Sequence, residues 1–170
     1  MFSLFHINSE GRVFAFNLDT GNEIWVRDTA DNVSGGIESG FKKLIYGTLD
    51  GEVIVLDQER GSEIWRSQAP SEILSSPVTD GNVVVVQSTN GSVAGFDLKT
   101  GEEKWVHQSS LPSLSLRGTS KPILDQGFVF TGFANGINRG ALLLVSDTPM
   151  APEGVKTEES DKEVTRKYVD

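Results

Sequence analysis

The feature that most constrains the fold is an internal repeat with a period of 40 residues. Trp25, Trp65 and Trp105 lie at this interval, and each follows a glycine by four residues. Those glycines are Gly21, Gly61 and Gly101. Regular spacing of this length is typical of proteins built from stacked, structurally similar units, so the unit has to be interpreted before any single residue.

Each unit contains enough short apolar runs for four strands. In the third unit, residues 82–88 hold four valines and predict a buried central strand, and Asn90-Gly91 predicts a tight hairpin after it. Residues 72–79, 92–98 and 102–108 predict the other three strands. Four strands per repeat of this length predict an all-β fold, a partial β-propeller of about three four-stranded antiparallel blades.

The repeated residues have structural roles that follow from their chemistry. A tryptophan adds apolar area near the blade edge, and its N–H can reach a backbone carbonyl of the next blade. Asn17, Asp57 and Asp97 can accept hydrogen bonds from turn amides. The small residue two positions before each of them (Ala15, Val55 or Gly95) is expected to leave room for the indole.

The repeat predicts two regions of different character. We expect residues 1–148 to form the blades and residues 149–170, which are charged and contain Pro149 and Pro152, to be a disordered tail. The spacing stretches to 45 residues between Gly91 and Gly136, and the five extra residues fall near 111–118. Such an insertion is either a binding loop or a longer connection with its leucines turned inward, and the pattern favours neither.

Composition excludes several classes of function. The net charge of −9 leaves no basic patch for nucleic acid or for an anionic membrane surface. There are no cysteines, and His6 and His107 lie in different units, so we expect no metal site, no cofactor and no catalytic residues. No apolar run is long enough to span a membrane as a helix.

The motif from Asp97 through Gly101 to Trp105 resembles the tryptophan-docking repeat of the PQQ-like propellers, an eight-bladed family. Residues 112–118, Pro-Ser-Leu-Ser-Leu-Arg-Gly, are similar to a segment of the BamB family, the propeller lipoproteins of the outer-membrane β-barrel assembly machinery. Val33-Ser34-Gly35-Gly36 and Leu74-Ser75-Ser76-Pro77-Val78 occur in the same order as in that family.

The resemblance implies a non-catalytic scaffold at the periplasmic face of the outer membrane that assists the assembly and insertion of β-barrel proteins. Its partner would be the barrel subunit, bound through that subunit's periplasmic transport domains. The resemblance assigns this contact to Leu114, Leu116 and Arg117.

The chain departs from the family pattern in two ways. It has no recognisable signal peptide and no cysteine to carry a lipid, and the repeat fades after residue 136, so we expect a truncated N-terminal part of such a protein. Two alternatives stay open: a fragment of a PQQ-dependent quinoprotein dehydrogenase, and a sensor or extracellular propeller of unknown ligand. Against the dehydrogenase, the resemblance implies an adjacent cysteine pair that is missing here.

Overall fold

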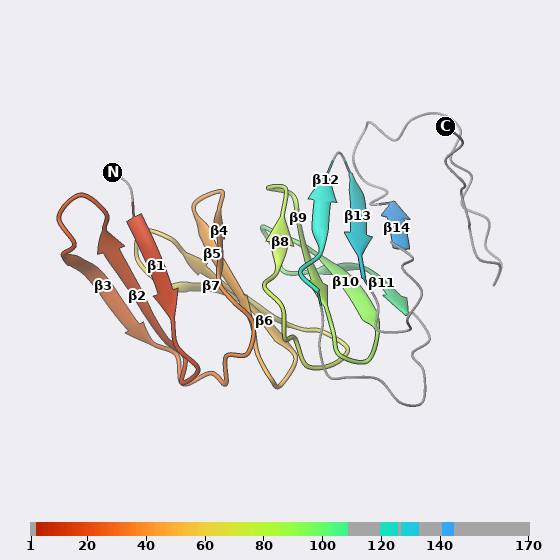
Figure 1. Cartoon of the computed structure of the whole chain (residues 1–170), viewed down its shortest axis with the longest axis horizontal. Coiled ribbons are helices and arrows are strands. Elements are labelled where there is room, and N and C mark those ends of the chain that lie inside the picture. The colour runs from red at the N-terminus through yellow and green to blue at the C-terminus, as the bar shows by residue number, and fades with distance from the viewer. Residues whose placement is uncertain (1–2, 109–119, 126, 133–140, 145–170) are drawn as a thin grey trace.

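Four antiparallel sheets stand side by side along the chain in a computed structural model that describes residues 3–108, 120–125, 127–132 and 141–144 (Figure 1). We call them blades 1 to 4 in chain order. Two have four strands and two have three, and the strands of each sheet follow their order in the sequence. Blade 1 comprises β1 (Ser3–Ile7), β2 (Arg12–Asn17) and β3 (Glu23–Asp28); blade 2, β4 (Glu38–Gly40), β5 (Lys43–Gly47), β6 (Glu52–Asp57) and β7 (Glu63–Gln68); blade 3, β8 (Val78–Thr79), β9 (Val83–Gln87), β10 (Ser92–Asp97) and β11 (Glu103–Gln108); blade 4, β12 (Ile123–Asp125), β13 (Phe128–Thr131) and β14 (Ala141–Leu144).

The predicted all-β propeller architecture is therefore confirmed, and within the described ranges no helix occurs and none could cross a membrane. The predicted division at residue 148 lies outside the described residues.

The cores lie between the blades because each sheet is apolar on both faces. In β9 every residue is buried, so alternate valines face opposite neighbours. Val84 and Val86 pack with Ile45 and Val53 of blade 2, whereas Val83 and Val85 pack with Val129 of blade 4. A single sheet of this composition could not bury both faces by itself, so the stack is the folding unit.

The turn before each outer strand has the same hydrogen bonds in blades 1 to 3. Oδ1 of Asp57 accepts from the backbone amides of Glu59 and Arg60 at 3.0 and 2.8 Å, and Gly61 closes the turn with φ of +66°. Asn17 and Asp97 do the same one repeat earlier and one repeat later. The amides of Thr100 and Lys99 hold the pKa of Asp97 below its ordinary value. The predicted turn role of these residues is confirmed.

The turns of blades 2 and 3 receive the tryptophans of the preceding blade. Trp65 Nε1 donates to the Leu98 carbonyl oxygen at 2.9 Å, and Trp25 Nε1 donates to the Gln58 carbonyl oxygen at 3.3 Å. The turn glycine lies beneath each ring, since a Cβ on Gly101 would come within 2.7 Å of Trp65 Cδ2. The turn glycine of the next blade therefore makes room for these two indoles, in addition to the small residue that pairs with each tryptophan, Ala15 or Val55.

Trp105 has the same backbone position but a different side-chain environment. It pairs with Gly95 as Trp25 pairs with Ala15, and each pair is followed by the same register shift. A Cβ on Gly95 would come within 2.3 Å of Trp105 Cε2, so here the indole lies against its own blade. Its buried Nε1 has no hydrogen-bond partner in the described part of the chain.

The innermost strand of blade 3 is shorter than the predicted strand over residues 72–79. Only Val78 and Thr79 pair regularly with β9, while Ile73 forms an isolated bridge to Ser88 in a different register. Pro77 lacks an amide hydrogen, and Ser75 and Ser76 lie against Gly35 and Gly36 of the preceding blade. The close approach of these two segments interrupts the strand.

We predict that replacing Trp65 with alanine lowers the free energy of unfolding by about 3–5 kcal/mol, because it removes a buried aromatic side chain at a blade junction. Urea denaturation followed by circular dichroism measures this. Ile64→Ala is the matched control, since the Ile64 side chain is 41% exposed on the same strand. Equal effects of the two substitutions would contradict a special role for the docked indole.

Candidate functional site

The blade-to-blade connections gather on one side of the stack and form the best candidate for a functional surface. Each connection leaves the outer strand of one blade and enters the inner strand of the next. The first two cover residues 29–37 and 69–77 and run along the lower part of the view in Figure 1. We call this surface the connection face. It consists of residues 29–37 and 69–77, together with Gln108 and Ser120 at the ends of the third connection.

Backbone hydrogen bonds hold the two described connections in the same way. The Thr29 and Ala69 amides donate to the carbonyl oxygens of Gly11 and Gly51 at 3.0 and 2.8 Å. Further along each connection, a carbonyl oxygen accepts a hydrogen bond from a hairpin turn of the next blade. The Leu49 amide donates to the Asn32 carbonyl oxygen and the Thr89 amide to the Glu72 carbonyl oxygen, both at 2.9 Å. Each connection is thus held at its first and at its fourth residue, which gives this part of the surface a defined shape.

The third connection contains the predicted binding residues. Leu114, Leu116 and Arg117 lie outside the described residues, so their role stays a prediction. Both ends of the connection are described: Gln108 Nε2 donates to the Asn90 carbonyl at 2.8 Å, as Gln68 does to Asp50 one repeat earlier. At the other end, Ser120 Oγ accepts from the Gly132 amide at 3.1 Å.

Lys121, next to Ser120, forms an ion pair with Glu38, whose Oε2 lies 2.7 Å from the lysine Nζ. Because Glu38 lies on the inner strand of blade 2, this pair joins the end of the third connection to a blade two positions back. The Lys121 side chain is half exposed to solvent, so the contribution of this ion pair to stability is small.

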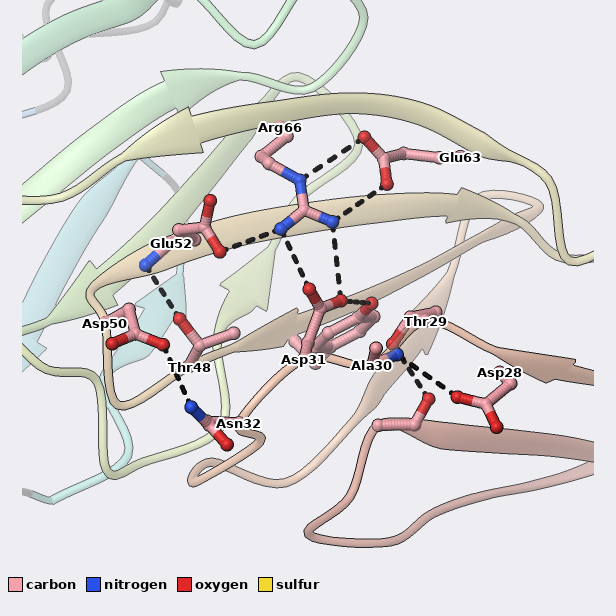
Figure 2. Close-up of polar contacts among 12 residues, drawn as sticks. Asp28, Thr29, Ala30, Asp31, Asn32, Thr48, Asp50, Glu52, Glu63 and Arg66 are labelled. Atoms are coloured by element: carbon pink, nitrogen blue, oxygen red, sulfur yellow. Dashed lines mark hydrogen bonds and ion pairs between the residues drawn. The ribbon is translucent and has the colours of Figure 1, made fainter.

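A polar network occupies the connection face between blades 1 and 2 (Figure 2). Arg66 Nη1 lies 2.9 Å from Asp31 Oδ1 and 2.7 Å from Glu52 Oε2, and Nη2 lies 3.0 Å from Glu63 Oε2. The buried Tyr46 hydroxyl donates to Asp31 Oδ2 at 2.7 Å. One guanidinium therefore holds three carboxylates, and Asp31 links the connection to strands β5 and β7.

The protonation of this network follows from its contacts. Burial raises the pKa of Asp31, but hydrogen bonds from Arg66 and Tyr46 outweigh burial and hold the pKa below its ordinary value. Burial, and then the bond to Asp31, raise the pKa of the Tyr46 hydroxyl. Hydrogen bonds to Glu63 and Asp31 raise the pKa of Arg66. Asp31 is thus a carboxylate at neutral pH, and the network stays charged.

The sequence analysis missed this network because the repeat does not carry it. The positions 40 residues after Asp31, Tyr46 and Arg66 hold Ser71, Val86 and Val106. These three polar departures from the repeat, at positions that are small or apolar one unit later, were the available signal.

The polar groups of this network bond to one another. In the described part of the chain no set of three His, Cys, Asp or Glu side chains could hold a metal ion. The two histidines are not brought together: His6 stacks on Phe14 in blade 1, with ring centroids 6.0 Å apart, and His107 lies on β11 of blade 3.

Comparison with known proteins gives a family and several structural relatives. The family model described as "Outer membrane protein assembly factor BamB" matches residues 9–146. Comparison with the curated proteins finds no relative. Among solved structures, BamB from Moraxella catarrhalis is similar, with 25% identity and a TM-score of 0.67 over 76% of this chain. The chain spans 38% of that protein's length.

Other structures share the fold at lower identity. A europium-containing methanol dehydrogenase is 21% identical with a TM-score of 0.56, covering 65% of this chain and 23% of its own. The computationally designed Ika4 protein is 16% identical with a TM-score of 0.70, over 84% of this chain and 85% of its own. These two likenesses show the propeller fold alone.

We predict that Asp31→Asn lowers the free energy of unfolding by about 1–3 kcal/mol at pH 7, because Arg66 and Tyr46 lose a charged acceptor. Since folding lowers the pKa of Asp31, its contribution is present above the ordinary value of 3.8 and is lost as the pH falls through the folded value. The wild type should therefore lose more stability than the variant between about pH 5 and pH 2.

Urea denaturation across that pH range measures the effect. Asp50→Asn is the matched control, because Asp50 is an exposed carboxylate on the same face whose side chain bonds Asn32. Parallel pH profiles for the wild type and the Asp31 variant would show that the network does not stabilise the fold.

Proposed function

This chain belongs to the family of the outer membrane protein assembly factor BamB, and on that basis we propose that it is a non-catalytic propeller scaffold. Its role would be to assist the assembly and insertion of β-barrel proteins into the outer membrane. The observation that carries the proposal is the extent of the family match, which runs from residue 9 to residue 146 and so includes the loop at 111–118. The proposed location is the periplasmic face of the outer membrane.

The proposed partner is the barrel subunit of the assembly machinery, bound through its periplasmic transport domains. We assign the contact to Leu114, Leu116 and Arg117 on the third connection. In an extended segment Leu114 and Leu116 would share one side, and each would bury apolar area at about 25 cal/mol per Å². Arg117 would add a charge-assisted hydrogen bond to a carboxylate or carbonyl of the partner.

The surroundings of this loop support the assignment. Gln108 and Ser120 hold its two ends, and the neighbouring connections at 29–37 and 69–77 are held by backbone hydrogen bonds. A binding loop between fixed ends loses less conformational freedom on association than a free segment does. The acidic network around Arg66 lies on the same side of the stack, where it would contribute polar contacts around an apolar centre.

We predict that Leu116→Ala and Arg117→Ala each weaken binding to the purified periplasmic domains of the barrel subunit by more than about 1 kcal/mol, roughly fivefold. Calorimetric titration measures the affinity. The thermal midpoint of unfolding should stay unchanged, because a contact residue is expected to act on the complex only.

Ser115→Ala is the matched control, since alternate residues of an extended segment point to opposite sides. A sharp drop in the thermal midpoint of the Leu116 or Arg117 variant, with a proportional loss of binding, would contradict the assignment. The loop would then be structural, with its leucines packed inward. Equal loss of affinity in the serine variant would also count against the assignment.

The enzymatic alternative has its own test. The methanol dehydrogenase shares the fold, and so does a quinohemoprotein alcohol dehydrogenase from Comamonas testosteroni. The Comamonas enzyme is 24% identical, with a TM-score of 0.52 over 62% of this chain and 19% of its own. We predict that titration with PQQ and calcium, followed by absorbance, gives no saturable binding, because the adjacent cysteine pair expected of these enzymes is missing. Saturation at one PQQ per chain would overturn the non-catalytic assignment.

A further inference from the structure

The face of blade 1 that points away from blade 2 is apolar and exposed. We call it the leading face and define it by Leu4, His6, Phe14, Phe16 and Leu18. Leu4 pairs with Phe16 and His6 with Phe14, and the rings of Phe14 and Phe16 are nearly parallel, with centroids 6.0 Å apart. Leu4 is 56% exposed and Leu18 58%. Exposed apolar side chains that gather on one face indicate a binding surface.

The repeat shows which kind of surface packs against such a face. The residues 40 positions after Leu4, His6, Phe14 and Phe16 are Leu44, Tyr46, Ile54 and Leu56 of blade 2. All four are fully buried, in a core that includes Val13 of blade 1 and against which Phe5 and Trp25 pack. In blades 2 and 3 these positions are covered by the sheet that comes before. The leading face is thus shaped for another sheet of the same kind.

The turn at Gly21 agrees with this. It has the φ of +71° and the hydrogen bond from Gly21 N to Asn17 O, at 2.8 Å, that the docking turns of blades 2 and 3 share. A Cβ on Gly21 would meet no atom within 4 Å, whereas one on Gly61 would lie 2.8 Å from the ring of Trp25. Blade 1 therefore keeps the geometry of a face that accepts a neighbour.

The opposite end of the stack offers the complementary face. We define the trailing face of blade 4 by Ile123, Phe128 and Phe130, the side chains that alternate with those packed on blade 3. The residues 45 positions earlier are Val78, Val83 and Val85 of blade 3. Those valines pack against blade 4. Ile123 is 63% exposed and Phe130 42%, so the trailing face of blade 4 is also open to a neighbour.

We propose that a second copy of this chain covers the leading face, with blade 4 of one copy packed on blade 1 of the other. The contact would continue the interface already present between blades 1 and 2 and between blades 2 and 3, apolar side chain against apolar side chain. Acidic side chains lie at the margin of each face, since Asp28 pairs with Arg12 on blade 1 and Asp125 pairs with Phe128 on blade 4, so the contact would be made by the apolar side chains between them. Such a contact is head-to-tail, and two copies that make it twice form a closed pair. This inference does not depend on the loop at 111–118.

Sedimentation velocity of the full chain tests the proposal. We expect concentration-dependent association below roughly 100 μM. Leu4→Lys and Ile123→Lys should each weaken it at least about tenfold, because each places a charge in one of the two faces. Both side chains are more than half exposed, so the fold should tolerate the lysine, which circular dichroism and a thermal midpoint check. Val106→Lys, on β11 within the stack, is the matched control.

Mixing the two variants separates a head-to-tail contact from other dimers. The Leu4 variant keeps its trailing face and the Ile123 variant keeps its leading face, so the mixture contains one unaltered interface and should associate more tightly than either variant alone. A wild type that stays monomeric throughout this range would overturn the proposal. Association that neither substitution weakens, or that mixing does not restore, would overturn it equally.

Discussion

The docking of an indole onto the turn of the next blade is the interaction on which the rest of this structure depends. Trp65 contributes its ring to the core between blades 2 and 3 and its N–H to the Leu98 carbonyl oxygen, so one side chain joins two sheets by packing and by a directed bond. The directed bond matters because apolar packing alone would let neighbouring sheets slide. Asp97 and Gly101 hold the receiving turn in the necessary shape, which explains why the same residue types recur together.

The sequence predicted the docking of Trp25 and Trp65 well because its motif occurs three times at a fixed spacing. The strands, the turn hydrogen bonds and the indole N–H acceptor all follow from residue types at fixed spacing. Two details did not follow. The inner strand near Pro77 is short because another backbone lies against it, and Trp105, whose indole lies against Gly95 as expected, has no hydrogen-bond partner for its Nε1 in the described part of the chain. Both depend on how segments approach one another in space, which a one-dimensional pattern does not contain.

Little of the candidate site, in contrast to the fold, could be predicted from the repeat. Asp31, Tyr46 and Arg66 occur once, so periodicity gave no reason to place them together, although they form a partly buried charged network. The loop with Leu114, Leu116 and Arg117 was found by resemblance, and only its ends at Gln108 and Ser120 belong to the described structure. In a repeat protein the regular positions determine the stack, and the exceptions to the repeat are the places to look for properties specific to one chain.

The contact of Gly35 and Gly36 with Ser75 and Ser76 has a geometric consequence. Sheets that pack face to face through ordinary side chains stand about 10 Å apart. At the inner edge of blades 2 and 3 these small residues let the two backbones come closer, while Trp65 holds the sheets apart toward the outer edge. This pair of blades is therefore a wedge, thin inside and thick outside. Side chains grow from glycine at the inner edge to tryptophan at the outer edge, and this gradient makes the stack curve. The volumes of these residues therefore set the radius of the arc.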